Sequence, residues 1–526
     1  MFGQCCVQSA TLRGMEALPV DVEVVVSAGL PGMSVVGMPD AAVQEARERV
    51  RAALRASGFS MPGEKVVVNL APGSLRKTGP GFDLPIAVGI LVATGQVDRS
   101  LAEGRLFVGE LSLEGAVRPV AGLLAYALAA RRLGCAFVCG AGGDHVPVEG
   151  VEQTVLRTLG RIRSGAFEPA RARRSPKCAD VSDFADVAGH ESAKRALQIA
   201  AAGEHGVLMT GPPGSGKTML AARLPSILPP LEGDEAMQTA LVHSVAGEDM
   251  GPVLAGRRPF RNPHHSASVA GLVGGGNPPR PGEVSLAHNG VLFLDELPEF
   301  KPAALQSLRQ PMEAGRVCVT RADGNVTFPA RFMLVAASNP CPCGYFGDRE
   351  RTCSCTAAQI RAYQGRIGGP LMDRIDLHLD VRRTTPHEVM GTGGGTSSEQ
   401  LREGVMRARA FARWRRAREG AARGPSQPGA SRPQGAGGGA GGLVEPGAGC
   451  GSPAALVREC RLSEADAAFL EQVAGANHMS GRAIMRVLRV ARTVADMDES
   501  PAVAKRHLCE AVGFRLREGD TGIPGL

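Results

Sequence analysis

The stretch "GVLMTGPPGSGKTMLAARL", residues 206–224, joins a short apolar run, a glycine-rich turn and a segment with helical periodicity. Within it, residues 211–218 match G-x-x-x-x-G-K-[ST], the sequence of a phosphate-binding loop. Glycines let the backbone N–H groups of such a loop wrap a phosphate, and the positive end of the following helix adds to the attraction. The stretch therefore predicts a strand, a loop and a helix of a doubly wound α/β domain that binds a nucleotide.

Every residue of this loop is a candidate nucleotide contact: Gly211, Pro212, Pro213, Gly214, Ser215, Gly216, Lys217 and Thr218. We expect Lys217 to reach the β- and γ-phosphates of ATP, and the hydroxyl of Thr218 to hold Mg²⁺. The alternative is a chance match in a chain that contains 69 glycines. The apolar strand before the loop and the helix after it favour a true nucleotide site.

A second apolar run, in "GVLFLDELPEF" at residues 290–300, ends in two carboxylates. A buried strand with this ending places both groups at the carboxyl edge of a parallel sheet, where ligands bind in such folds. We expect Asp295 to join the Mg²⁺ shell and Glu296 to orient or deprotonate the attacking water. The alternative is an acidic strand end that only meets solvent.

Three further residues complete the expected catalytic set. Asn339 follows the apolar run "FMLVAAS", so it can contact the γ-phosphate or the water. Arg374, between two aspartates in "GPLMDRIDLHLDV", can reach a neighbouring subunit's nucleotide as an arginine finger; a local Arg–Asp salt bridge is the alternative. Arg482 begins the helix "SGRAIMRVLRVARTVAD", and we assign it to the nucleotide, although an amphipathic lid helix has the same pattern.

The segment "SNPCPCGYFGDRERTCSC", residues 338–355, carries two Cys-x-Cys pairs. Cys341, Cys343, Cys353 and Cys355 supply four thiolates, the number that a closed tetrahedral Zn²⁺ site requires. The residues between the pairs are too polar and glycine-rich to hold a shape through a core of their own. A structural zinc ion is therefore expected, with free surface thiols or a redox pair as the alternatives.

The size and composition are those of a multidomain protein without a membrane anchor. The 526 residues suffice for two or three domains, and no apolar run is long enough to span a bilayer. The first residues lack the pattern of a secretory signal, so we expect a cytoplasmic protein with no membrane partner. In a reducing compartment 13 cysteines favour metal binding or catalysis over disulfides, and the net charge of +7 permits a polyanionic partner.

Shifts in composition divide the chain into five segments. A polar, basic stretch follows the first mixed α/β region, and a Gly/Pro-rich stretch at residues 424–453 cannot bury enough surface to fold. The predicted segments are an α+β domain (1–165), a linker (166–184), the ATPase core with the four-cysteine insertion (185–385), a basic helix with a flexible linker (386–453) and a helical lid (454–518).

Residues 185–518 resemble the magnesium-chelatase-like branch of the AAA+ ATPases, and within it the YifB/ComM family. The resembling stretches include "DVAGHESAKRALQIAAAGEHGVLMTGPPGSGKT", "SNPCPCGYFGD", "CTAAQIRAYQGRIGGPLMDRIDLH" and "SGRAIMRVLRVARTVAD". The resemblance implies a P-loop AAA+ core with an α-helical lid, ATP and Mg²⁺ as cofactors, the site residues named above, and self-association into a ring, with a homohexamer as the expected form. The family is associated with DNA uptake by transformation, in which the ring is thought to drive branch migration.

The amino-terminal domain resembles the Lon protease domain, which has an S5-like fold, but lacks its catalytic residues. "KTGPGFDLPIAVGILVATG" has Gly81 at the position of the nucleophilic serine, and "GELSLEGAVRPVAGLLAYALAARRLG" has Leu124 at the position of the lysine. A Ser–Lys dyad needs both groups. We therefore expect a scaffold or binding module without peptidase activity.

Three segments are candidates for contact with DNA. "CVTRADGNVTFPARF" predicts a hairpin that carries Arg321, and "FRNPHHSASVAGLVGGGNPPRPG" predicts a flexible loop with Arg261, His264, His265 and Arg280. "LREGVMRARAFARWRRARE" is a basic helix that holds Trp414, and arginines with an aromatic ring suit single-stranded DNA. The alternatives are packing at a subunit interface for the two loops, a metal site for the histidine pair, and a solvated face for the helix.

The leading hypothesis is an ATP-driven ring motor on single-stranded or branched DNA that promotes branch migration or unwinding. One rival is a chelatase motor subunit that drives metal insertion into a tetrapyrrole. The other is an AAA+ scaffold or unfoldase. Intact Lys217 and Glu296 disfavour a scaffold without ATPase activity.

Overall fold

The computed structural model describes most of the chain: residues 3–171, 182–321, 324–348, 350–367, 369–385, 387, 390, 395–422 and 453–515. The predicted Gly/Pro-rich linker, except Pro453, and the last three residues of the predicted lid lie outside the described residues. Among the helices that the structure describes, none is long and apolar enough to cross a membrane.

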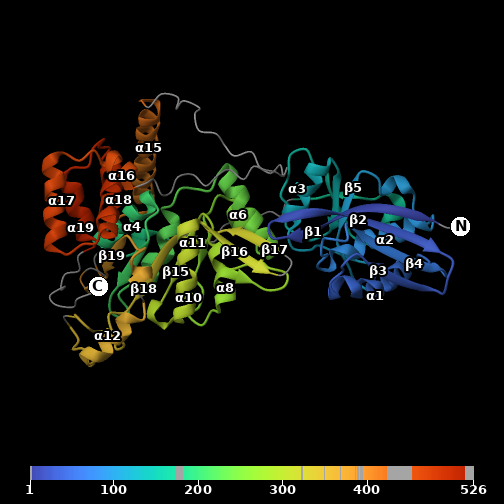
Figure 1. Ribbon diagram of the computed structural model, residues 1–526, viewed down its shortest axis with the longest axis horizontal. Helices are drawn as coiled ribbons and strands as arrows, with labels where there is room; N and C mark the ends of the chain where they lie inside the picture. Colours follow the sequence, from blue (N-terminus) through green and yellow to red (C-terminus); the bar gives the residue numbers. More distant parts are fainter. Residues whose placement is uncertain are drawn as a thin grey trace.

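The amino-terminal part is an eight-stranded sheet with helices on both faces (Figure 1). In spatial order its strands are β10 (Glu168–Pro169), β9 (Gln153–Leu156), β8 (Ala136–Gly140), β5 (Arg105–Val108), β1 (Gln4–Arg13), β2 (Glu16–Ser27), β4 (Lys65–Ala71) and β3 (Gly32–Val36). Strand β2 alternates buried valines with exposed residues, as a sheet with one face on a core requires. Helices α1 (Ala41–Ala56) and α2 (Asp83–Ala93) pack on one face, and α3 (Leu123–Leu133) packs on the other.

Strand β10 lies within the stretch that the sequence predicts as a linker. Glu168 pairs with Val155 of β9 and also forms ion pairs with Arg157 and Arg161. The first folded part therefore extends beyond residue 165, because a basic, polar segment can still add an edge strand when its backbone pairs with the sheet.

The central part is a five-stranded parallel sheet covered on both faces, as predicted for a doubly wound core. Its order is β12 (Phe260–Arg261), β15 (Val291–Leu294), β18 (Met333–Ser338), β11 (Val207–Thr210) and β19 (Leu377–Asp380). Helices α4 (Glu191–Gly203) and α5 (Lys217–Arg223) cover one face, and α8 (Val269–Val273), α10 (Pro302–Ser307) and α11 (Arg309–Ala314) lie against the other. Strands β11, β15 and β18 are fully buried, which explains their continuous apolar runs.

The carboxyl-terminal helices form a layer on the α4 side of this sheet, at the end of the molecule opposite the amino-terminal part (Figure 1). They are α15 (Ser398–Ala422), α16 (Pro453–Cys460), α17 (Glu464–Ala476), α18 (Gly481–Met497) and α19 (Lys505–Gly513). Helix α18 begins at a Ser480 cap and buries a stripe of apolar residues against α4 and α15. This stripe is the amphipathic lid pattern that the sequence indicated.

A buried network of ion pairs joins Arg415 of α15 to Glu459 of α16 and Asp496 of α18. Arg415 is 2% exposed; its guanidinium donates to Asp496 over 3.1 and 3.3 Å and to Glu459 over 3.2 Å. We expect Arg415→Met to lower the free energy of unfolding by about 3 kcal/mol, because the buried Asp496 carboxylate keeps Arg492 but loses the second of its two arginine partners. Arg413→Met, two residues away on the exposed face, should change it by less than about 0.5 kcal/mol. Thermal unfolding followed by circular dichroism compares the two variants, and equal melting temperatures would contradict the network's role.

The amino-terminal and central parts pack together through α3 and α6 (Gly233–Ala246). The backbone N–H of Leu124 donates to the Ser244 hydroxyl over 3.2 Å, and that of Gly122 donates to the Ser244 carbonyl over 2.7 Å. Leu124, at the position of Lon's lysine, is thus a buried packing residue. Gly81 is buried as well, since a Cβ there would lie 3.1 Å from a methyl of Val108. Both residues therefore lie at packing positions in this part of the chain.

Candidate active site

The predicted phosphate loop connects β11 to α5 at the carboxyl edge of the parallel sheet. Gly214 and Gly216 have φ angles of 75° and 85°, a region that residues with a side chain rarely adopt. These two glycines let the chain reverse between strand and helix while its backbone faces the phosphate position. The local sequence therefore explains the loop's shape directly.

Lys217 lies at the centre of this loop and is 9% exposed. Its ammonium group donates to the carbonyl oxygens of Gly211 and Pro212, at 2.8 and 2.9 Å, and to the Asn339 side-chain oxygen at 3.3 Å. Burial lowers the pKa of Lys217, while the negative charge of Asp295 opposes that shift. The lysine and Asn339 thus converge on one point, as expected for adjacent strands β11 and β18.

The two carboxylates at the end of β15 lie beside the loop. The Thr218 hydroxyl donates to Asp295 over 2.8 Å, so the two expected Mg²⁺ ligands are in direct contact. A hydroxyl and a carboxylate are hard oxygen donors of the kind that Mg²⁺ selects, so this pair fits the ion. Glu296 has a left-handed φ of 51° and an exposed side chain, 3.7 Å from Nδ1 of His265. Backbone in this region is costly and gathers at functional sites.

Arg374 lies at the opposite edge of the sheet from its own phosphate loop. Arg374 comes just before β19, and the first residue of β19 pairs with the first residue of β11. The phosphate loop, in contrast, follows the last residue of β11. Four strand residues separate the two edges by about 13 Å. Arg374 is half-buried and forms an ion pair with Glu313 of α11. Burial lowers its pKa, and the nearby Arg309 and Arg482 lower it further.

Arg482 lies in the same region as Arg374, away from its own nucleotide loop. It is 77% exposed and 3.9 Å from Asp373, the residue before Arg374. Arg486, one turn along α18, lies against the carbonyls of Met372 and Ile375. In this arrangement Arg482 does not face the phosphate loop of its own subunit. The sequence could not predict this, because it does not show at which edge of the sheet the lid packs.

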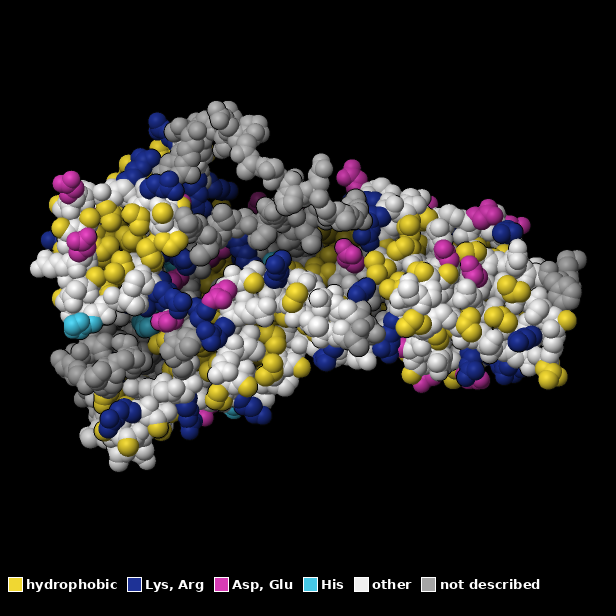
Figure 2. Space-filling view, in the orientation of Figure 1, with side chains coloured by type: hydrophobic (Ala, Val, Ile, Leu, Met, Phe, Trp, Pro, Cys, Tyr) yellow, Lys and Arg dark blue, Asp and Glu magenta, His cyan; other side chains and the backbone are white. Residues whose placement is uncertain are grey.

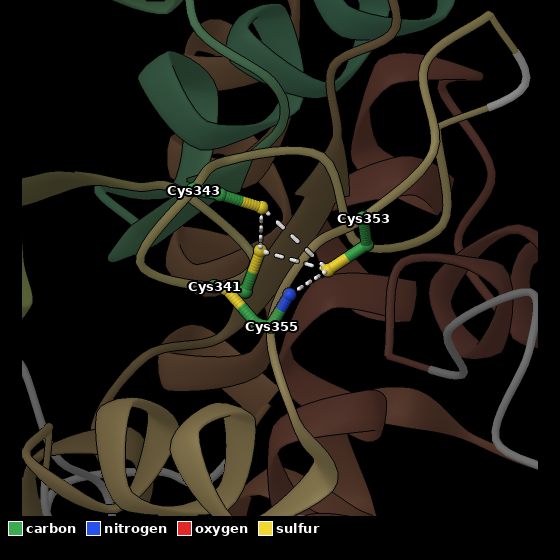
Figure 3. A group of neighbouring side chains, drawn as sticks. All are labelled: Cys341, Cys343, Cys353 and Cys355. Carbon is green, nitrogen blue, oxygen red and sulfur yellow. Dashed lines mark hydrogen bonds between the residues drawn. The ribbon is translucent and has the colours of Figure 1, made fainter.

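The four cysteines converge as predicted for a metal centre (Figure 3). Their ligand atoms lie within 4.8 Å of one another, and three of the Sγ–Sγ distances are 3.4, 3.6 and 3.7 Å. Tetrahedral zinc with bonds of 2.3 Å places sulfurs about 3.8 Å apart. The backbone N–H groups of Phe346 and Cys355 donate to the sulfurs of Cys341 and Cys353. A hydrogen bond from the Tyr345 backbone is the main cause that lowers the pKa of Cys343 to about 5.

His264 and His265 are not part of a comparable cluster of metal ligands among the described residues. Within the described ranges, the cysteine cluster is the group of three or more Cys, His, Asp or Glu side chains whose ligand atoms lie close enough to share a metal ion. His264 instead contacts the Ser266 hydroxyl at 2.8 Å, and the centres of the two imidazole rings lie 4.0 Å apart with the ring planes tilted by 35°.

Two of the candidate DNA-binding segments lie side by side. The predicted hairpin is formed by β16 (Arg316–Arg321) and β17 (Gly324–Pro329). A Cβ placed on Gly275, in the glycine-rich loop, would lie 3.7 Å from the Arg321 guanidinium. Arg280 and Arg321 are both exposed. Arg261 is not available for DNA in this way, because it forms a two-point ion pair with Glu283 at 2.7 and 2.9 Å.

Helix α15 carries the third candidate, and Figure 2 shows Lys and Arg side chains gathered over it. Trp414 is 48% exposed and lies against the Phe411 ring, with the Arg418 guanidinium 5.1 Å from its centre. The exposed arginines of this helix are Arg402, Arg407, Arg413, Arg416 and Arg418.

Sequence reasoning missed two contacts of the site. It placed His265 in a loop but not beside Glu296, and it did not propose Glu313 as the partner of Arg374. Both pairs join segments about 30 to 60 residues apart through the packing of α8 and α11 on the sheet. A single sequence carries no local signal for such contacts.

Comparison with known proteins agrees with this geometry. Residues 183–389 match a family model described as "Magnesium chelatase, subunit ChlI", residues 395–515 match the C-terminal model of that subunit, and residues 22–141 match "Subunit ChlI of Mg-chelatase". The chain is 39% identical to the uncharacterised protein YifB of Escherichia coli K12, over 97% of this chain and 96% of YifB.

Two further relatives extend the comparison. Competence protein ComM of Haemophilus influenzae is also 39% identical, over 97% of both chains. An uncharacterised protein of Mycobacterium tuberculosis is 44% identical over 77% of this chain and 83% of its own length. With matches of this extent, the chain belongs to the YifB/ComM family of magnesium-chelatase-like AAA+ ATPases.

Proposed function

We propose that this ATPase forms a ring, expected to be a homohexamer, and moves on single-stranded or branched DNA, where it promotes branch migration or unwinding. The observation that carries the proposal is the shared surface of the β16–β17 hairpin and the glycine-rich loop. It presents Arg280 and Arg321 to solvent, close in sequence to the strand that ends in Glu296. A full nucleotide site and a basic, loop-built surface are what a DNA motor needs. The competence protein among the relatives supports a role in natural transformation.

The ring accounts for the two arginines that lie away from their own phosphate loop. In a closed assembly, Arg374 and Arg482 of one subunit would face the nucleotide of the next. Arg374 would neutralise charge on the transferred phosphoryl group, as an arginine finger does. Lys217 would hold the phosphates, Thr218 and Asp295 would hold Mg²⁺, and Asn339 would position the attacking water that Glu296 activates. Bound Mg²⁺ would supply charge neutralisation at the phosphates.

The four thiolates fit a structural zinc ion, which we include in the proposal. Four protein ligands fill a tetrahedral shell and leave no open position for a substrate. Zinc would therefore shape the segment rather than take part in hydrolysis.

We expect Arg321→Ala combined with Arg280→Ala to weaken single-stranded DNA binding at least tenfold, because two phosphate contacts are lost. Unwinding of a three-stranded junction should fall in parallel, while ATP hydrolysis without DNA stays within twofold. Fluorescence anisotropy and a strand-displacement assay measure the two effects. Arg316→Ala, at the base of the hairpin, serves as the control. If the pure ATPase neither binds nor unwinds forked or three-stranded DNA, the motor proposal is wrong.

The family descriptions favour one alternative, a motor subunit for metal insertion into a tetrapyrrole. It predicts ATP hydrolysis that responds to a porphyrin and a partner subunit and does not respond to DNA. Hydrolysis rates measured with each addition in turn distinguish the two functions.

A further inference from the structure

We propose that the four-cysteine zinc centre supports the phosphate-binding loop from outside, so that zinc occupancy controls how tightly this ATPase binds nucleotide. The inference rests on the proposed zinc site and is independent of the proposed action on DNA. It follows from one steric contact between the two segments.

That contact joins Gly344 and Pro213. Gly344 lies between Cys343 and Tyr345, is buried, and has a φ of +86°. A Cβ at this position would lie 2.5 Å from Cδ and 2.7 Å from Cγ of Pro213, so the backbone of the cysteine segment lies directly on the proline ring. Pro213 is the third residue of the phosphate loop. The position of the segment therefore limits where the loop can lie.

The chain also connects the two sites. Cys341 is two residues beyond Asn339, whose side chain accepts a hydrogen bond from Lys217. The turn from Cys341 to Gly344 is closed by a backbone hydrogen bond of 2.9 Å. Movement of Cys341 would thus displace Gly344 and, through it, Pro213. It would also displace Asn339 and so change the hydrogen bond between Asn339 and Lys217.

Without metal, little else holds the cysteine segment in place. Of its described residues between 341 and 355, only Cys341 and Gly344 are buried. Arg383 lies 3.8 Å from the carboxylates of Asp348 and Glu350, and its guanidinium lies 5.4 Å from the centre of the Tyr345 ring. Partly exposed contacts of this kind contribute little to stability. Zinc binding by four thiolates is far stronger than such surface contacts. The metal is therefore the main restraint on the segment.

A pair of glycines in the segment provides a matched test. Gly344→Ala adds a methyl group against Pro213, whereas Gly347→Ala adds one at a φ of +77° with nothing within 4 Å. Both variants place a side chain at a similar positive φ and keep all four cysteines, and Gly344→Ala alone of the two adds a contact with Pro213. Full-length protein is purified without chelator, its zinc content is measured by atomic emission, and the affinity for a fluorescent ATP analogue is measured without DNA.

We expect Gly344→Ala to keep its zinc and to bind the analogue at least tenfold more weakly than Gly347→Ala. Cys355→Ser should lose both zinc and affinity. Equal affinities for the two glycine variants, or an unchanged affinity after loss of zinc, would overturn the coupling. Protein that neither contains zinc nor binds added Zn²⁺ would overturn the metal centre itself. None of these outcomes depends on DNA unwinding, so the motor proposal is tested separately.

Discussion

Glu296→Gln should lower the turnover number for ATP hydrolysis at least 100-fold and leave the affinity for ATP within twofold. The amide cannot accept a proton from water, and general-base catalysis contributes about 10²–10⁴-fold. Lys217, Thr218 and Asp295, which would hold the phosphates and Mg²⁺, are unchanged. Steady-state hydrolysis and binding of a fluorescent ATP analogue measure the two quantities.

The matched control is Glu299→Gln, one turn later. Glu299 forms an ion pair of 3.6 Å with Arg366, and its substitution removes the same charge close to the site. It should change the turnover number less than threefold. A Glu296→Gln enzyme that keeps more than a tenth of wild-type turnover would show that another group activates the water.

Arg374→Ala should lower hydrolysis by about 10³-fold, the scale at which arginine fingers act. Nucleotide binding by the isolated subunit should not change, because Arg374 lies at the other edge of the sheet from the phosphate loop. Glu313→Gln is the control: it removes the ion pair within the subunit and keeps the guanidinium. Its hydrolysis should stay within fivefold of wild type.

Mixing two inactive variants tests whether Arg374 acts between subunits. Arg374→Ala keeps its phosphate loop, and Lys217→Ala keeps its arginine. A mixed ring therefore contains some complete sites at subunit boundaries, and hydrolysis should recover to a level set by the mixing ratio. Mixtures that demonstrably assemble together but stay inactive would contradict the assignment.

Local chemistry explains what the sequence predicts well. The phosphate loop, the Asp295–Glu296 strand end and the cysteine cluster each depend on residues close together in the chain. In a parallel sheet, strand ends meet at one edge, so the meeting of Lys217, Thr218, Asp295 and Asn339 also follows from the sequence.

Long-range packing explains the rest. Arg261 belongs to a loop that the sequence indicates is open, yet Glu283 holds it because α9 (Glu283–Leu286) packs nearby. The sequence predicts that Arg482 contacts a nucleotide. Because α18 packs at the amino edge of the sheet, Arg482 lies near Asp373 within its own subunit. The contact of Gly344 with Pro213 depends on how a loop without periodicity folds back. None of these placements has a signal within a few residues.

The short strand β11 has a mechanical consequence for a ring. The phosphate loop follows the carboxyl end of β11, which has four residues. Arg374 lies in the turn before β19, next to the amino end of β11. Because β11 and β19 pair residue by residue, the phosphate loop and Arg374 would move together if a subunit of the proposed ring rotated as a rigid body. One nucleotide pocket would then open or tighten in step with the next around the circle, with no rearrangement inside any subunit.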